Sequence, residues 1–220
     1  MRSLLKFITP HKTIPHTPWR AEHRWQLSPA RIAILFFGLA IFGLGDSLLV
    51  QGNTGNAPWT VFAQGLSIKT GWAIGVSTAV ISVCVLLFWI PLREKPGFGT
   101  LANIALIATL IQIGTGIFPR AESYAVGIAY DLVGIALVGI GSALYITCGL
   151  GPGPRDGMMT GLHLRTGIRV GRVRLAIEVT VLAIGWLMGG TVGAGTLLFA
   201  LLIGNSIAIS LGVVARLTSR

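Results

Sequence analysis

The sequence predicts an all-α membrane protein whose six transmembrane helices form a 3+3 inverted repeat. The chain is 53% hydrophobic and only 11% charged, whereas soluble domains carry about 25% charged residues. Six apolar segments reach the length of about 20 residues that a membrane-spanning helix needs. A shift of 96 positions aligns the chain with itself without a gap over about 60 positions. The 30 glycines also suit a bilayer, where small residues let helix backbones pack closely.

The first 30 residues are basic and interrupted by Pro10, Pro15 and Pro18. They lack the apolar core of a signal peptide. We therefore expect residues 1–30 to form a cytoplasmic N-terminal segment.

The six expected spans divide equally between two halves of the chain. Residues 31–118 form the first three-helix repeat, and residues 119–220 form the second, which ends in a short cytoplasmic C-terminus. The glycine-rich run 189–195 separates the last two spans, which would otherwise be one overlong segment. The expected spans are Ile32 to Gln51, Trp72 to Leu92, Gly99 to Phe118, Tyr124 to Cys148, Gly171 to Met188, and Gly195 to Ala215.

The basic residues orient these spans. With the N-terminus in the cytoplasm, 15 of the 17 lysines and arginines face the cytoplasm, and only Lys69 and Arg120 lie outside. Cytoplasmic loops are expected to be rich in these residues, so both termini are predicted to be cytoplasmic. The same distribution accounts for the net charge of +10, and we expect no nucleic-acid partner. The cytoplasmic set is Arg2, Lys6, Lys12, Arg20, Arg24, Arg31, Arg93, Lys95, Arg155, Arg165, Arg169, Arg172, Arg174, Arg216 and Arg220.

The internal alignment keeps proline and Thr-Gly pairs in register as well as glycines. Gly55 and Pro58 fall on Gly151 and Pro154, and Thr70-Gly71 falls on Thr166-Gly167. Because each half has an odd number of spans, the second half enters the membrane in the opposite direction. Inverted repeats of this kind are common in secondary transporters, where the substrate site lies at the repeat interface.

A short helix follows the first span of each half. Proline favours the first turn of a helix and glycine the residue after its end, so we place these helices at 58–70 and 154–166. Such a helix is about 20 Å long, too short to span the bilayer. Each helix is either interfacial or re-entrant.

The starts of the two short helices are the candidate substrate site. A helix N-terminus exposes N–H groups and about half a positive charge. We therefore predict that a central site is lined by Asp46 and by the six residues that begin the short helices: Pro58, Trp59, Thr60, Pro154, Arg155 and Asp156. In the alternative, Thr60 and Asp156 only cap their helices and Arg155 is one more topology charge.

Three acidic residues fall within the expected spans, where ionisable groups are costly and often functional. Asp46 and Asp131 lack a cationic neighbour in sequence and are candidates for proton or cation handling. The alternative for each is a hydrogen-bonded or snorkelling carboxylate near the outer interface. Glu178 is a further proton or ion candidate, but Arg174 lies four residues earlier and can pair with it structurally.

Two stretches of the chain resemble the bacterial YczE/YyaS/YitT-type integral membrane proteins, and the YczE branch in particular. The first pairs Gly-Asp-Ser-Leu-Leu-Val (45–50) with Ala-Pro-Trp-Thr (57–60), and the second is Gly-Leu-Gly-Pro-Gly-Pro-Arg-Asp-Gly (149–157). The run 189–196 fits the same family. The resemblance implies a protein of the bacterial cytoplasmic (inner) membrane, for which transport is the usual conjecture. It implies neither a substrate nor catalytic residues.

We predict a permease or exporter of an unidentified small solute, embedded in the lipid bilayer and able to form a homo-oligomer. The alternative is a membrane-embedded accessory or scaffold protein that binds a partner complex without transporting. An enzyme is the weakest interpretation, because the sequence has no zinc-binding, phosphate-binding or nucleophile motif. Cys84 and Cys148 lie in apolar segments, so neither a disulfide framework nor a metal or other cofactor is expected. A transporter should contain a central cavity, whereas an accessory protein should have a closed interior.

Overall fold

In the computed structural model of the protein, residues 13–218 are described, and they form α-helices without a β-strand. Arg2, Lys6, Lys12 and Arg220, four basic residues expected on the cytoplasmic side, lie outside the described residues. The helices of the first half are α2 (Pro29–Gly52), α3 (Pro58–Thr70), α4 (Ile74–Leu87), α5 (Trp89–Leu92) and α6 (Phe98–Ile117). Those of the second half are α7 (Tyr124–Thr147), α8 (Pro154–Thr166), α9 (Val170–Leu187) and α10 (Ala194–Thr218).

Within residues 13–218, five helical segments are long and apolar enough to cross a membrane, with α4 and α5 counted together. They correspond to five of the six spans expected from the sequence. The sixth expected span forms α9, which is helical over 18 residues but is not among the five. Arg172, Arg174 and Glu178 lie in its first half and interrupt the apolar run.

The two short helices have the bounds that the sequence predicted, and each contains 13 residues. Each begins with proline, Pro58 or Pro154, because the first turn needs no N–H from that residue. Each ends at a left-handed glycine, with φ of 74° at Gly71 and 70° at Gly167. A residue with a side chain is disfavoured at this φ, so the two glycines terminate the helices.

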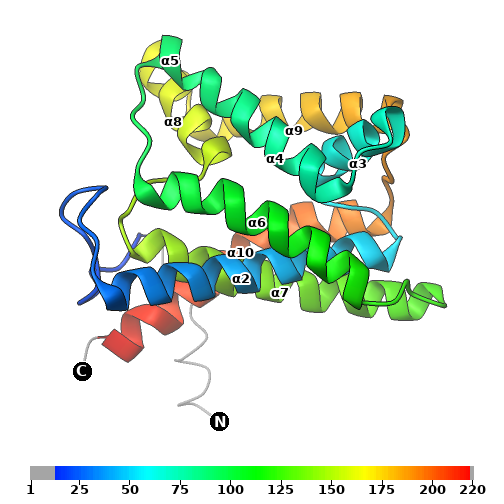
Figure 1. Cartoon of the computed structure of the whole chain (residues 1–220), viewed down its shortest axis with the longest axis horizontal. Coiled ribbons are helices and arrows are strands. Elements are labelled where there is room, and N and C mark those ends of the chain that lie inside the picture. The colour runs from blue at the N-terminus through cyan, green and yellow to red at the C-terminus, as the bar shows by residue number, and fades with distance from the viewer. Residues whose placement is uncertain (1–12, 219–220) are drawn as a thin grey trace.

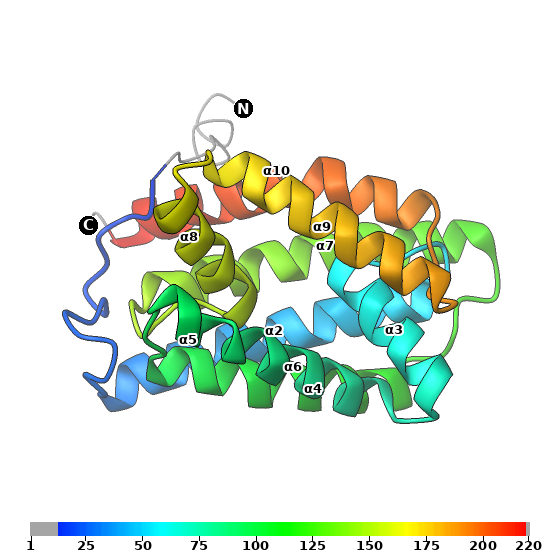
Figure 2. The same ribbon diagram turned by 90° about the horizontal axis from the view of Figure 1, so that it is seen from above.

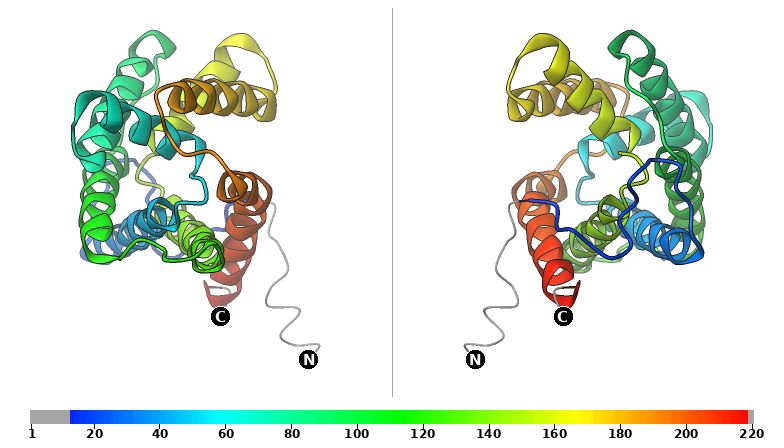
Figure 3. Two further views of the ribbon diagram at one scale, coloured as in Figure 1. Left: turned by 90° about the vertical axis from the view of Figure 1, so that its right-hand side faces the viewer. Right: turned by 90° about the vertical axis from the view of Figure 1, so that its left-hand side faces the viewer.

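The long helices run along the longest axis of the molecule (Figure 1). α2 and α7 form the most extensive interface, and α6 packs on α2 while α10 packs on α7. α4 and α9 lie above these four helices in Figure 1, and the end-on views of Figure 3 show them on opposite sides. α3 and α8 lie toward opposite ends of the molecule (Figure 2).

The α2–α7 interface is close because glycines face each other across it. A Cβ added at Gly45 would lie 2.8 Å from the carbonyl oxygen of Gly134, and one at Gly134 would lie 2.8 Å from that of Gly45. Gly38 and Gly141 meet in the same way farther along the interface. Close backbone approach of this kind replaces the hydrophobic driving force that lipid does not supply between helices.

Some backbone contacts between the first and second halves of the chain come in pairs, in which a shift of 96 positions turns one contact into the other. The Gly195 N–H donates to the Thr54 carbonyl at 3.1 Å, and the Gly99 N–H donates to the Leu150 carbonyl at 2.8 Å. The packing of the short helices is also reciprocal: α3 packs on α9 of the other half, and α8 packs on α4 and α5 of the other half. Each short helix therefore packs more extensively on helices of the other half than on those of its own.

The described part of the N-terminal segment packs against the ends of α6 and α7. The Ala21 N–H donates to the Cys148 carbonyl at 2.9 Å, and the Phe98 N–H donates to the Arg24 carbonyl at 3.2 Å. The Trp19 indole N–H reaches the Thr147 hydroxyl at 3.3 Å. These bonds fix the segment to the same end of the molecule at which α2 begins and α7 ends.

Candidate functional site

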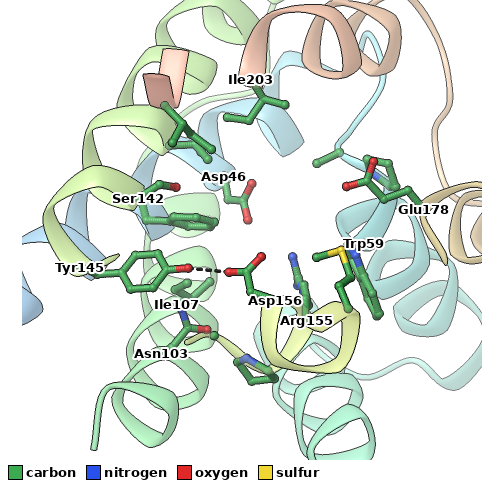
Figure 4. A pocket seen from close by; sticks show the side chains of 18 of the residues that line it. Asp46, Trp59, Asn103, Ile107, Ser142, Tyr145, Arg155, Asp156, Glu178 and Ile203 are labelled. Atoms are coloured by element: carbon green, nitrogen blue, oxygen red, sulfur yellow. Dashed lines mark hydrogen bonds between the residues drawn. The ribbon is translucent and has the colours of Figure 1, made fainter. Parts of the chain in front are cut away.

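A cavity of about 260 Å³ lies between the two halves of the chain. Residues of α2, α4, α6, α7, α8, α9 and α10 line it, together with Trp59 at the start of α3. Most of its wall is apolar, and a few polar and charged side chains converge on it (Figure 4). This combination is typical of binding sites for small molecules.

Most of the cavity wall consists of pairs of residues that the sequence alignment with a shift of 96 positions places opposite each other. A shift of 96 positions exchanges the members of each pair, so the cavity lies where the two halves meet. Eight such pairs line it: Phe42 and Val138, Asp46 and Ser142, Ala57 and Gly153, Pro58 and Pro154, Trp59 and Arg155, Ser82 and Glu178, Asn103 and Phe199, and Ile107 and Ile203.

The structure brings together six of the seven residues that the sequence placed at a substrate site. They come from α2 and from the starts of the two short helices, and they are Asp46, Pro58, Trp59, Pro154, Arg155 and Asp156. Thr60 is not part of the cavity wall; it is 2% exposed, and its hydroxyl oxygen has no hydrogen-bond partner within the described chain.

The starts of α3 and α8 meet through Trp59 and Arg155. The guanidinium carbon of Arg155 lies 5.1 Å from the centroid of the Trp59 ring, which is within the range of a cation–π contact. These two residues are themselves an equivalent pair, one from each half. The expectation that Arg155 is only a cytoplasmic topology charge does not account for its position over a buried ring in the cavity.

Asp156 does not cap α8, which corrects the capping alternative. Its Oδ2 atom accepts a hydrogen bond from the Tyr145 hydroxyl of α7 at 2.7 Å (Figure 4). The residue at the N-cap position is Gly153, and in α3 it is Ala57, neither of which has a side-chain oxygen. Because Pro152 and Pro154 fix the chain around Gly153, Asp156 lies inside the first turn, where its carboxylate points toward α7.

Asp46 is the most isolated charge in the cavity. Its side chain is 2% exposed, and its Oδ2 atom has no hydrogen-bond partner among residues 13–218. Figure 4 shows its carboxylate directed into the same space as Arg155. The opposite charges of Asp46 and Arg155 attract each other across this space, although no ion pair joins them.

The other two acidic candidates have partners. Glu178 lines the cavity and pairs with Arg174 at 2.8 Å, which confirms the pairing predicted from their spacing of four residues. Asp131 lies outside the cavity wall, is fully buried, and accepts a hydrogen bond from the Thr54 hydroxyl. The hydrogen-bonded alternative therefore describes Asp131 better than it describes Asp46.

Several polar residues of the cavity were not among those that the sequence placed at the substrate site. Tyr145, Ser142 and Asn103 all line it, and Tyr145 holds the Asp156 carboxylate. The repeat contained a signal for Ser142, because a shift of 96 places it on Asp46. Tyr145 and Asn103 had no such signal, since their equivalents are Leu49 and Phe199.

The cavity can bind charge of either sign. Arg155 and Arg174 offer N–H donors, while Asp46, Asp156 and Glu178 offer carboxylate oxygens. Within residues 13–218, no group of three or more His, Cys, Asp and Glu side chains is arranged to hold a metal ion. The arrangement is suited to binding a small polar molecule by hydrogen bonds and ion pairs.

Comparisons with known proteins find relatives along most of the chain. A family described as a family of unknown function, DUF6198, matches residues 29–211. An uncharacterized protein of Haemophilus influenzae is 43% identical over 206 residues, which are 94% of each chain. In Bacillus subtilis, the uncharacterized membrane protein YczE is 35% identical over 82% of this chain and 85% of its own. The uncharacterized protein YyaS of the same organism is 31% identical over 81% of this chain and 91% of its own. No solved structure matches the chain.

Proposed function

Because the chain belongs to the DUF6198 family of unknown function, we propose its function from the cavity itself: the protein is a transporter of small polar solutes. The observation that carries this proposal is the charged cavity of about 260 Å³ between the two halves. An accessory protein without transport has no need to keep a buried carboxylate such as Asp46, whose Oδ2 atom accepts no hydrogen bond from the described residues, in its interior, where a charge is costly. The cavity therefore favours transport over the accessory alternative.

The proposed transporter has six membrane crossings and an inverted repeat. The reciprocal contacts support the repeat, since exchange of the halves turns the Gly195–Thr54 bond into the Gly99–Leu150 bond. Three crossings in each half make the second half inverted. Inverted-repeat transporters bind substrate at the repeat interface, near discontinuous or short helices, and the cavity between α3 and α8 has this position.

The sixth crossing is α9, in which two of the charged residues pair with each other. Arg174 and Glu178 line the cavity and pair with each other, so these two charges are directed away from lipid. Arg172 lies in the first turn of α9, where a long side chain can extend to the membrane surface. At 18 residues the helix is about 27 Å long, close to the thickness of the hydrocarbon core.

The location that follows is the bacterial cytoplasmic membrane, with both termini in the cytoplasm. The arginines of the second short helix and of the start of α9 support this orientation, because the equivalent loop of the first half contains a single lysine, Lys69.

Alternating access can be tested without knowing the substrate. In a background lacking Cys84 and Cys148, Ser82→Cys places a thiol at the cavity wall on α4. A small charged methanethiosulfonate reagent, which does not cross membranes, is added to right-side-out and to inside-out vesicles. We expect Ser82→Cys to react in both preparations, because a transporter opens its cavity to each side in turn.

The matched control is Ser77→Cys on the same helix. Ser77 is fully buried and does not line the cavity, so it should react in neither preparation. Reaction of Ser82→Cys from one side alone, or from neither side, would contradict transport and support the accessory alternative.

A further inference from the structure

Two opposite charges in the cavity, Asp46 and Arg155, attract each other but form neither a hydrogen bond nor an ion pair within residues 13–218. Asp46 is 2% exposed, and its Oδ2 atom accepts no hydrogen bond from the described residues. The Arg155 guanidinium makes its cation–π contact with Trp59, but within residues 13–218 it has neither a hydrogen bond nor an ion pair. Asp46 is buried and Arg155 is partly buried, and a charge removed from water is costly without a close partner, so both groups gain from a ligand of opposite charge.

The other charged groups of the cavity each have an ion-pair or hydrogen-bond partner. Glu178 pairs with Arg174 at 2.8 Å, and Asp156 accepts the Tyr145 hydroxyl at 2.7 Å. These pairings leave Asp46 and Arg155 as the two charged groups most available to a ligand.

Asp46 and Arg155 come from different halves and point into one space without forming an ion pair with each other (Figure 4). An anion bound to Arg155 alone would lie near the uncompensated Asp46 carboxylate. A cation bound to Asp46 alone would leave the donors of Arg155 unused. A molecule with both charges satisfies both groups.

We propose that the cavity binds a small zwitterion of the amino-acid type, with its carboxylate on Arg155 and its ammonium group on Asp46. This assignment names the substrate class of the transporter proposed above and rests on that function. Arginine suits a carboxylate because its planar guanidinium donates two parallel hydrogen bonds. The volume of about 260 Å³ restricts the ligand to a small molecule, since pockets for drug-sized ligands measure about 300–1,000 Å³.

The test is titration calorimetry on the full chain in lipid nanodiscs. The zwitterions are glycine, L-alanine, L-leucine, β-alanine and 4-aminobutyrate, which vary the side chain and the distance between charges. Propionate and ethylamine are the controls, since each retains one of the two charged groups of β-alanine. We expect at least one zwitterion to bind with a Kd at least tenfold below that of either single-charge compound.

Substitutions then assign each charge of the ligand to its residue. Asp46→Asn should weaken zwitterion binding by about tenfold to a hundredfold, the usual effect of losing a charged hydrogen bond, without weakening propionate binding. Arg155→Gln should weaken both the zwitterion and propionate. Glu122→Gln and Arg120→Gln make the same charge changes at exposed positions outside the cavity and should leave affinities unchanged.

The ligand series on the unmodified protein keeps the test valid if a variant fails to fold. Equal affinity for β-alanine and for one of its single-charge analogues, or absence of binding by all five zwitterions, would overturn the assignment. Such a result would leave the transport proposal standing if Ser82→Cys reacts from both sides of the membrane. Reaction of Ser82→Cys from one side alone would instead contradict both the transport proposal and the substrate class assigned to it.

Discussion

Tyr145 positions the Asp156 carboxylate, and its removal should lower stability more than a comparable change elsewhere. Tyr145 is 4% exposed, and Tyr145→Phe leaves the Asp156 carboxylate without its 2.7 Å hydrogen bond. A hydrogen bond to a charged group contributes about 1.5–3 kcal/mol. We therefore expect the thermal unfolding midpoint in nanodiscs to fall by several degrees. Asp156→Asn should have a smaller effect, because the amide oxygen can still accept the hydroxyl proton.

Tyr130→Phe on the same helix is the matched control. Tyr130 lies outside the cavity wall, and its hydroxyl makes no hydrogen bond within the described chain. The thermal unfolding midpoint of Tyr130→Phe should therefore stay close to that of the unmodified protein. Equal losses in Tyr145→Phe and Tyr130→Phe would show that the hydrogen bond to Asp156 contributes little.

The packing of α3 on α9 depends on the absence of side chains at two glycines. A Cβ added at Gly65 would lie 2.5 Å from the carbonyl oxygen of Gly185 and 2.8 Å from the Cβ of Met188. Gly65→Ala should therefore separate the two helices and reduce stability by about 1–3 kcal/mol, the usual cost of overpacking. The measurement is thermal unfolding, followed by the reactivity of Ser82→Cys, since the start of α3 forms part of the cavity wall.

Gly204→Ala is the control for helix propensity. Gly204 lies in α10 with open space around its Cα, so an added methyl contacts no other part of the described chain. Alanine should leave stability unchanged or raise it by about 0.5–1 kcal/mol, because glycine is unfavourable inside helices. A loss at Gly204 as large as that at Gly65 would mean that close approach to α9 is not the cause.

The bounds of helices could be predicted because they depend on residues next to each other in sequence. Pro58 and Pro154 begin the short helices and Thr-Gly ends them, so α3 and α8 have the expected limits. The Arg174–Glu178 pair was predictable for the same reason, since its members lie one helical turn apart. The break between α4 and α5 at Phe88 was not predicted, although Pro91 was a signal for it, because proline has no N–H to donate to the Leu87 carbonyl.

Contacts across the cavity could be predicted only in part. The repeat indicated that the starts of α3 and α8 lie near each other, but it did not specify that Arg155 lies over Trp59. The partners of Asp156 and Asp131 depend on how α7 is rotated against its neighbours. That rotation follows from glycine contacts between distant parts of the chain, which a single sequence does not reveal. The resemblance to YczE and YyaS is confirmed by their identities of 35% and 31%.

The orientation of the whole molecule can be tested at two equivalent positions. Lys69 and Arg165 differ by 96 in number, end the two short helices, and are both exposed. In the background lacking Cys84 and Cys148, intact cells expressing Lys69→Cys or Arg165→Cys are treated with an impermeant thiol reagent. Lys69→Cys should be labelled and Arg165→Cys should be protected, because the inverted halves place them on opposite sides.

Permeabilised cells provide the control, since both positions should then be labelled. Labelling of both sites in intact cells would contradict the topology with six crossings and cytoplasmic termini.

Each short helix packs on helices of the other half, so the order of synthesis on the ribosome decides when each of these contacts can form. α3 ends at Thr70 and its partner α9 begins at Val170, so 100 residues of synthesis separate them. At about 5–20 residues per second, α3 waits roughly 5–20 s for that partner. α8 does not wait, because α4 and α5 have already been made when Pro154 emerges. Two similar contacts are thus formed in opposite orders in time, and of the two short helices only α3 passes through a period in which its glycine face lacks its partner helix.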